Sequence, residues 1–285
     1  RSRNDLRESE ILRFAQNDKR KGIFHQLGIS RVLAVALIGL SILWGARAQS
    51  IQNVEDFSTD PGWEGRNNAP EPNAGITKRQ DFGYSLTGFA GRAVGELGGT
   101  ICRSLRPSYY AKLIPVKTLE DRLTVSGKFA VTNSSGSSGV LIGWFNTASR
   151  GWRTPNSLVM RLDGEEDAFR VFFEYGTQTF KTGGGTTFEG PYQTTTTPMR
   201  RADGTVHTWA LTYDPQGANG SGEIVVLLDG SEYRTSLESG HKEEGAVFDR
   251  FGVFNQQISG QAMTVYFDDL IIDGEKELSL IHISE

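Results

Sequence analysis

Short extended segments recur through the middle of this sequence, and no stretch there shows apolar residues at helical spacing over a dozen positions. Between residues 51 and 274, β-branched and aromatic runs alternate with clusters of Gly, Asn, Asp and Ser. We expect strands at 123–131, 140–145, 157–162, 169–175, 207–213, 223–228, 251–255 and 263–272. Strands without helices bury their apolar faces against another sheet, so the pattern predicts an all-β domain, either a sandwich or a closed barrel.

The connections between these segments carry the chemistry of tight turns. Asp-Gly pairs at 163–164, 203–204, 229–230 and 273–274 place a glycine where positive φ is required, which predicts hairpins. Two Gly-, Ser- and Thr-rich stretches, 133–139 and 182–187, are predicted to be loops inside one domain. An immunoglobulin-type sandwich needs about 100 residues and a Cys and Trp framework that is missing here. A larger two-sheet antiparallel jelly-roll sandwich in a single domain fits better.

Charge and cysteine content exclude several classes of function. The formal net charge is −4, so the chain as a whole has no cationic surplus for binding nucleic acid. The single cysteine, Cys102, cannot form an internal disulfide. With only four scattered histidines beside it, a zinc site of the usual spacing is also excluded.

The ends of the chain differ from its middle. Residues 1–28 are charged and poor in apolar residues, and we expect a non-native or disordered leader there. Residues 29–48 contain an apolar run of about a dozen residues after Arg31, followed by Ala46-Arg47-Ala48, the pattern of a secretory signal peptide. The run is shorter than the roughly 20 residues that span a bilayer, which argues against a permanent membrane anchor.

The predicted mature domain is 49–277, exported by a bacterium into the periplasm or the medium. Residues 278–285 resemble a non-native tail. Further domains of the natural protein are therefore expected to be missing beyond Glu277.

Four segments resemble strands of the concanavalin-like, laminin-G-like jelly rolls, a superfamily of lectins and glucanases. They are 207–214, with Trp209, and 222–230, which ends in Asp-Gly, followed by 248–255 and 265–274 as penultimate and closing strands. The resemblance implies the fold far more than the function, because this superfamily holds lectins, carbohydrate-binding modules, glucanases, polysaccharide lyases and adhesion domains.

The resemblance also implies that ligand binds along one sheet, where aromatic rings stack on sugar faces and amides or charged groups take the hydroxyls. Alternation along the strands assigns Leu141 and Phe145 to the core and Trp144 to the opposite, polar face. The predicted ligand-binding residues are Trp144, Asn146, Trp152, Arg161, Glu174, Asn255 and Gln257. The alternative is a solvated sheet face with an ion pair between Arg161 and Glu174. Trp209 is assigned to the core.

No catalytic pattern of the superfamily is present. The carboxylate signature of the glucanases is absent, and so is the Gln-x-His strand of the polysaccharide lyases. His207 and His241 have no evident partner in the sequence. The acidic run 165–167 follows a predicted turn, where a solvated position is expected.

Calcium is the one cofactor that the pattern favours, as a structural ion. Sandwiches of this class often tie the first strand to the last with Ca²⁺, and Glu55, Asp56, Asp268 and Asp269 have the residue types and positions for such a site. The alternative is that Asp268 caps a turn while its neighbour is solvated.

These observations favour a secreted module that recognises carbohydrate, or serves in adhesion, through one sheet face and loop aromatics. The alternatives are a polysaccharide lyase or glycoside hydrolase of the same fold, and a purely structural domain of a larger surface protein.

Overall fold

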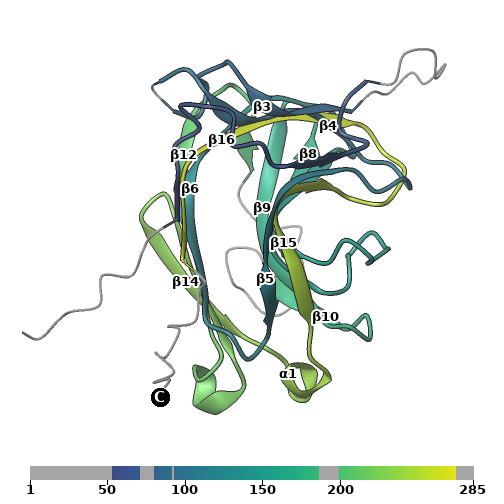
Figure 1. The fold of residues 1–285 in the computed structure, drawn as a ribbon, viewed down its shortest axis with the longest axis vertical. Coiled ribbons are helices and arrows are strands. Elements are labelled where there is room, and N and C mark those ends of the chain that lie inside the picture. Colours follow the sequence, from purple (N-terminus) through teal and green to yellow (C-terminus); the bar gives the residue numbers. More distant parts are fainter. Residues whose placement is uncertain (1–52, 71–79, 92, 186–198, 274–285) are drawn as a thin grey trace, which may run out of the picture. The chain divides into compact units, whose positions relative to one another are not determined.

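The computed structural model describes residues 53–70, 80–91, 93–185 and 199–273, which form two antiparallel β-sheets packed face to face (Figure 1). The predicted leader, signal peptide and tail lie outside the described residues. Two short helices accompany the strands, a 3-10 turn at Ala218–Gly220 and α1 at His241–Glu244. In the part of the chain that is described, neither has the length or the apolar surface needed to cross a bilayer.

The first sheet consists of seven strands in one path and one strand beside it. In order across the sheet these are β14 (Ser231–Ser236), β13 (Glu223–Leu228), β12 (Val206–Asp214), β6 (Leu123–Ser134), β16 (Ala262–Asp273), β4 (Glu96–Cys102) and β3 (Asp81–Ser85), with β1 (Asn53–Glu55) paired to β16.

The second sheet likewise consists of seven strands in one path and one strand beside it. Its path is β10 (Thr182–Gly185), β9 (Ala168–Gly176), β8 (Ser157–Glu165), β7 (Gly139–Phe145), β15 (Val247–Asn255), β5 (Tyr109–Thr118) and β2 (Glu64–Arg66), with β11 (Arg200–Arg201) paired to β9. Neither sheet closes on itself, so the prediction of a two-sheet sandwich is confirmed.

All eight predicted segments lie in strands, but several other strands were not predicted. Strand β4 contains Gly98 and Gly99, and β5 contains Pro115, residues that normally argue against a strand. Both exceptions have a local reason. A Cβ at Gly98 would lie 2.2 Å from the carbonyl oxygen of Val265 on the neighbouring strand, so glycine permits close pairing there. At Pro115, strand β5 has a neighbouring strand on one side only, β15, because β2 pairs only with residues 109–111. A proline is expected at such a sheet edge.

Two predicted connections are wrong. Asp163 and Gly164 continue strand β8, and the chain turns after them, where Asp167 has φ of +54°. Gly164 remains extended because it pairs with Phe169 across the hairpin. The stretch 182–187 was expected to be a loop, but 182–185 form β10 against β9. The turns at 203–204 and 229–230 are confirmed by positive φ at Gly204 and Gly230.

The prediction that Trp144 faces outward is wrong. Its side chain is 1% exposed and packs edge-on against Phe251 in the core between the sheets, with 5.2 Å between ring centroids. Leu141 and Phe145 are also buried, but on the outer face of the second sheet. Every residue of β7 is buried, so the strand is covered on both faces and its apolar run carries no alternation from which to read the orientation.

The neighbouring strand β8 does alternate as predicted. Leu158, Met160 and Leu162 point into the core. Val159 and Arg161 are on the outer face of the sheet. The core position of Trp209, which is 2% exposed, is also confirmed. The sandwich thus presents an outer face of the second sheet that carries both apolar and charged side chains.

Candidate functional site

The outer face of the second sheet carries a compact apolar patch at its centre. Phe145 and Phe254 stack there with 4.3 Å between ring centroids, and Tyr109 meets Phe145 edge-on at 5.6 Å. The patch consists of Tyr109, Ala111, Leu141, Phe145, Val159 and Phe254, all buried. Outer-face side chains can be buried only if something covers them, and here loops between the strands do so.

Beside this patch lies a charged cluster, which we call the floor: Arg103, Arg161, Asp163 and Glu174. Arg161 is 1% exposed and donates from Nε and one terminal nitrogen to the two carboxylate oxygens of Glu174, each at 3.0 Å. Its other terminal nitrogen is 2.8 Å from Asp163, which also pairs with Arg103. The guanidinium of Arg161 further lies 3.9 Å above the ring of Phe172.

Burial lowers the pKa of the Arg103 guanidinium, an effect that Asp163 opposes and Arg161 reinforces. The floor therefore holds two guanidinium groups on one shared carboxylate. The ion pair between Arg161 and Glu174, which belonged to the alternative interpretation, is present on a face that is buried and not solvated, and the structure adds Arg103 and Asp163 to it.

Four loops, which we call the rim, border this face. They are 103–108 between β4 and β5, 146–156 between β7 and β8, 177–181 between β9 and β10, and 256–261 between β15 and β16. Three of them meet around one hollow, which is lined by Ser108, Ser149 and Gln257 together with Phe145 and Phe254 of the patch.

Several predicted ligand-binding residues brace the rim. Asn255 is fully buried, donates from Nδ2 to the carbonyls of Ser104 and Arg106, and accepts from the amide of Ser108. Asn146 donates to the carbonyl of Val247 and accepts from the amide of Ala148. Such hydrogen bonds fix the loops that carry other side chains.

Gln257 links two rim loops by accepting a hydrogen bond from the amide of Gly151 at 3.1 Å. The bond joins the loop after β15 to the loop after β7. Together with Asn255 and Asn146, it holds the rim in place over the outer face.

Trp152 differs from the other predicted residues because it is open to solvent, with 39% of its surface exposed. The guanidinium of Arg153 lies 4.7 Å from the centre of its ring. Phe180, half exposed, packs beside the same loop, since a Cβ at Gly151 would lie 2.6 Å from its ring. Each rim loop exposes one large apolar side chain: Leu105, Trp152, Phe180 and Ile258.

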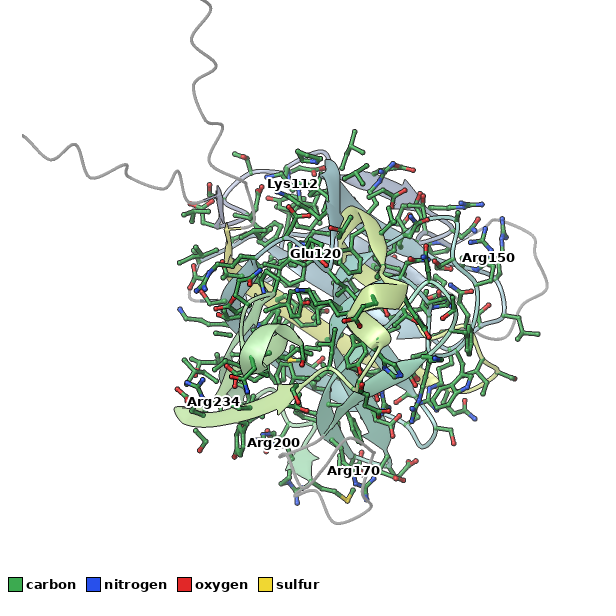
Figure 2. The ribbon with its side chains drawn as sticks, turned by 90° about the horizontal axis from the view of Figure 1, so that it is seen from below. Lys112, Glu120, Arg150, Arg170, Arg200 and Arg234 are labelled. Atoms are coloured by element: carbon green, nitrogen blue, oxygen red, sulfur yellow. The ribbon has the colours of Figure 1, made fainter. Side chains whose placement is uncertain are left out.

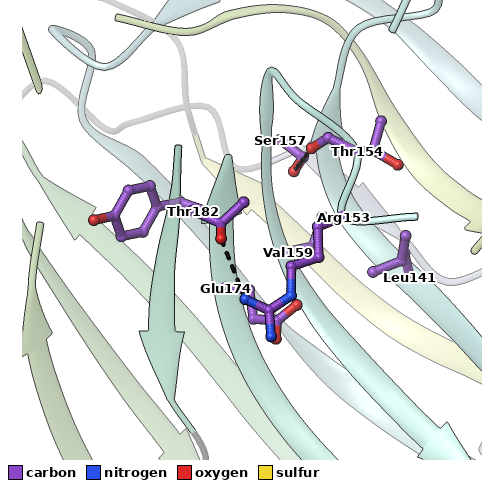
Figure 3. A pocket seen from close by; sticks show the side chains of 8 residues that line it. Leu141, Arg153, Thr154, Ser157, Val159, Glu174 and Thr182 are labelled. Carbon is purple, nitrogen blue, oxygen red and sulfur yellow. Dashed lines mark hydrogen bonds between the residues drawn. The ribbon is translucent and has the colours of Figure 1, made fainter. Parts of the chain in front are cut away.

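A second hollow lies beneath Arg153, and Figure 3 shows its lining. Arg153 donates to the hydroxyl of Thr182 at 3.2 Å, and Glu174 and Ser157 complete the polar part of the wall. Thr154 lines both hollows. Each hollow offers only about 10 Å³ to a water molecule, so they are small recesses in a covered face and not one open groove.

The four predicted calcium ligands do not come together. Glu55 pairs with Lys112 at 2.8 Å, Asp56 accepts from Ser58 in its own turn, and Asp269 pairs with Lys128. Within the described residues, no group of three or more His, Cys, Asp or Glu side chains could hold a metal ion.

Asp268 is the remaining one of the four. It is 2% exposed, and burial raises its pKa to about 6, with Asp269 and Glu96 adding to the rise. Both carboxylate oxygens of Glu96 are already occupied by the amides of Phe89 and Ala90. The set of four therefore does not fit a single ion, and calcium stays a prediction that depends on Asp268.

Both histidines that lacked a partner in the sequence have one in the structure. His241 Nδ1 lies 2.8 Å from the hydroxyl of Tyr175, and His207 Nδ1 lies 2.9 Å from Asp229. Tyr175 and His241 are both buried, and Tyr175 also contributes to the lining of the recess beneath Arg153.

The sequence interpretation missed Arg103, Arg153 and Phe180. Arg103 follows directly after a strand that was not predicted, so its position on this face could not be inferred. Trp152 was predicted to bind ligand, and the position of Arg153 directly after it was the signal that could have identified this arginine.

No protein-family model matches the sequence, and no curated protein matches it. Solved structures do resemble the chain. A glycoside hydrolase family 16 protein of Bacteroides ovatus, in complex with a mixed-linkage glucan product, is 12% identical, with 77% of this chain and 98% of that one covered and a TM-score of 0.44.

Two further similar structures are the carbohydrate recognition domain of Emp47p and a family 7 alginate lyase. The first is 12% identical over 76% of this chain and all of the other, with a TM-score of 0.38. The second is 9% identical over 59% of this chain and 69% of the other, with a TM-score of 0.37. All three are concanavalin-like jelly rolls, the superfamily that the sequence resembles, and the likeness is one of fold.

Proposed function

We propose that this protein is an exported carbohydrate-recognition module that binds glycan across the rim, over the outer face of the second sheet. The observation that carries the proposal is the exposed Trp152, backed by Arg153 and next to Phe180. Two exposed aromatic rings on adjoining loops can stack on the apolar faces of sugar rings. Polar groups in the recess beneath them, Thr182 and Ser157, can bond to hydroxyls.

The rim surface, and not the sheet itself, is the contact surface in this proposal. Arg161 and Glu174 are buried and paired with each other, and Arg161 also pairs with Asp163, so both side chains already serve the protein's own ion-pair cluster. Trp144 packs in the core and does not form part of this contact surface. Of the residues predicted to bind ligand, Trp152 is therefore the direct contact, and Asn146, Asn255 and Gln257 hold the rim in position.

Catalysis is not part of the proposal. Hydrolysis of a glycosidic bond needs one protonated and one ionised carboxyl group on either side of it. On this face both oxygens of Glu174 accept hydrogen bonds from Arg161, and Asp163 bridges two arginines. The pair formed by Tyr175 and His241 is buried.

A glycan array on the purified protein tests the proposal. Trp152→Ala and Phe180→Ala should each weaken binding to the hits about five- to tenfold, since stacking on one ring contributes about 1 kcal/mol or more. Phe89→Ala is the matched control, because Phe89 is 47% exposed but stacks on Tyr266 of the first sheet. Absence of any glycan hit, or equal losses in the control, would contradict the proposal.

A further inference from the structure

The four rim loops contain five cationic residues and no acidic one. Arg103 and Arg106 lie in 103–108, Arg150 and Arg153 in 146–156, and Lys181 in 177–181. The chain as a whole carries a net charge of −4, so this concentration of positive charge is local. Loops in an acidic protein have no general reason to exclude Asp and Glu.

Neighbouring carboxylates neutralise only part of this charge. Asp163 is shared by Arg103 and Arg161, Glu174 pairs with Arg161, and Lys181 pairs with Glu244. Three cations, Arg103, Arg161 and Lys181, are thus paired with these three carboxylates. At the adjoining edge Arg250 pairs with Glu64 and also approaches Asp249, which accepts hydrogen bonds from Thr147.

Arg150 and Arg153 stand out among these cations. Arg150 donates to the carbonyls of Thr147 and Ser149, and Arg153 donates to the hydroxyl of Thr182. Within the described residues, no ion pair joins either of them to a carboxylate. Arg150 is exposed, and Arg153 lies over Trp152 and lines the recess beneath it.

A second, independent observation concerns buried polar atoms. The described residues contain seven buried side-chain nitrogen or oxygen atoms without a hydrogen-bond partner, and four of them belong to the rim. These four are the Nε atoms of Arg103 and Arg153 and both amide atoms of Gln256, a residue that is fully buried. Three of the four can donate and one can accept. Unsatisfied buried groups are rare, and around the rim the unsatisfied donors outnumber the unsatisfied acceptors, in line with the excess of guanidinium groups there.

From these observations we infer that the rim binds an anionic polysaccharide, one that carries carboxylate or sulfate groups along its chain. This inference deepens the proposed function and rests on it. Arg150 and Arg153 bind the acidic groups as guanidinium forks, while Trp152 and Phe180 hold the sugar rings between them. The recesses are too small to admit a whole polymer, so the chain lies across the rim.

Binding to two pairs of matched polymers tests the inference. Polygalacturonate is compared with fully methyl-esterified polygalacturonate, and dextran sulfate with dextran, so that the two members of each pair share a sugar backbone and differ in their charged substituents. We expect the protein to bind at least one charged polymer ten times more tightly than its neutral counterpart. Raising the salt from 50 to 500 mM should weaken that binding at least tenfold, because exposed charges are screened. Comparison of the two charged polymers shows whether carboxylate or sulfate is preferred.

Substitutions of an arginine pair and of a single arginine test which residues bind the charged polymer. Arg150→Gln combined with Arg153→Gln should lower the affinity for the charged polymer at least tenfold and leave the neutral polymer unaffected. Arg234→Gln is the matched control, since Arg234 pairs with Glu223 and Glu232 on the first sheet, and Figure 2 shows it at the opposite margin of the molecule from Arg150. Circular dichroism and unfolding in urea confirm that each variant is folded.

The outcomes that overturn the inference differ from those that overturn the proposed function. Equal binding of charged and neutral polymers, or binding of neutral polymers alone, would leave glycan recognition intact and reject the anionic ligand. Equally tight binding of a single-stranded DNA oligonucleotide would show a general response to polyanions and would also reject it. Binding to none of the four polymers rejects the inference, whereas the glycan array with Trp152→Ala decides the proposed function separately.

Discussion

Arg161 and Glu174 are diagonal neighbours on adjacent strands of the second sheet, joined by two hydrogen bonds of 3.0 Å. Their side chains are only 2% and 11% exposed. An ion pair removed from water in this way stabilises the fold only while both partners are present, because a single buried charge without its counterion is costly. The pair therefore belongs to the architecture that supports the rim.

Glu174→Gln should lower the free energy of unfolding by about 3–5 kcal/mol, since it leaves Arg161 without one of its two carboxylate partners. Replacing both residues with apolar ones, as in Arg161→Met with Glu174→Leu, should restore much of that loss. Unfolding in urea measures both. Arg234→Gln, at an exposed pair, should change the stability by less than about 1 kcal/mol. A Glu174→Gln protein as stable as the wild type would show that the pair is not a structural element.

Two tryptophans eight positions apart should respond in opposite ways. Trp144→Ala removes a side chain from the core and should cost about 3–5 kcal/mol of stability. Trp152→Ala changes an exposed ring and should leave the stability within about 0.5 kcal/mol of the wild type while lowering glycan affinity. Thermal or urea unfolding alongside a binding assay distinguishes the two. Large destabilisation by Trp152→Ala would mean that the loop depends on its ring.

Asp268 should make the stability depend on pH. Burial raises its pKa in the folded protein to about 6, above the ordinary value of 3.8 for an aspartate. Between these values the folded state keeps a proton that the unfolded state has lost, so this contribution is complete below pH 4 and is lost as the pH rises to about 6. Asp268→Asn should flatten the stability profile between pH 4 and 6. Wild-type and variant curves that run parallel in urea unfolding would contradict the assignment.

Calcium binding can be measured directly. Calcium at a hundredfold excess over its dissociation constant would stabilise the protein by about 2.7 kcal/mol. We expect the melting temperature to rise with calcium and fall with a chelator, and Asp268→Asn to abolish both shifts, because Asp268 is the one buried carboxylate among the four predicted ligands. Magnesium is the control. An unchanged melting temperature in the wild type would show that the calcium prediction is wrong.

Gly139 offers a test of how closely the rim packs on the sheet. A Cβ at this position would lie 2.5 Å from Oε1 of Gln256 and 3.0 Å from a terminal nitrogen of Arg103. Gly139→Ala should therefore displace both side chains, cost about 1–3 kcal/mol, and weaken binding of the charged polymer. Gly220→Ala is a useful comparison because nothing lies within 4 Å of its Cβ position, although its φ of +89° adds some strain. Unchanged stability and binding in Gly139→Ala would show that Gln256 and Arg103 can rearrange freely.

The sequence alone was sufficient for the fold class and for much of the packing. Alternation of side chains is a local property with a period of two, so Leu158, Met160 and Leu162 could be assigned to the core and Arg161 to the other face. Strand β7 shows where this reasoning stops, because a continuous apolar run is compatible with either orientation of Trp144.

Tertiary structure alone decided which face is covered and what the rim contains. Strand β15 pairs with β7 on one side and with β5 on the other, which places loops 103–108 and 256–261 at one end of the second sheet and loop 146–156 at the other. The hydrogen bond from Gly151 to Gln257 joins the two ends over the outer face. Arg103, Arg153 and Gln256 come from three such loops, more than 150 positions apart at the extremes. Their grouping depends on long-range strand pairing, which no local periodicity encodes, and so does the burial that turns the expected open sheet into a covered one.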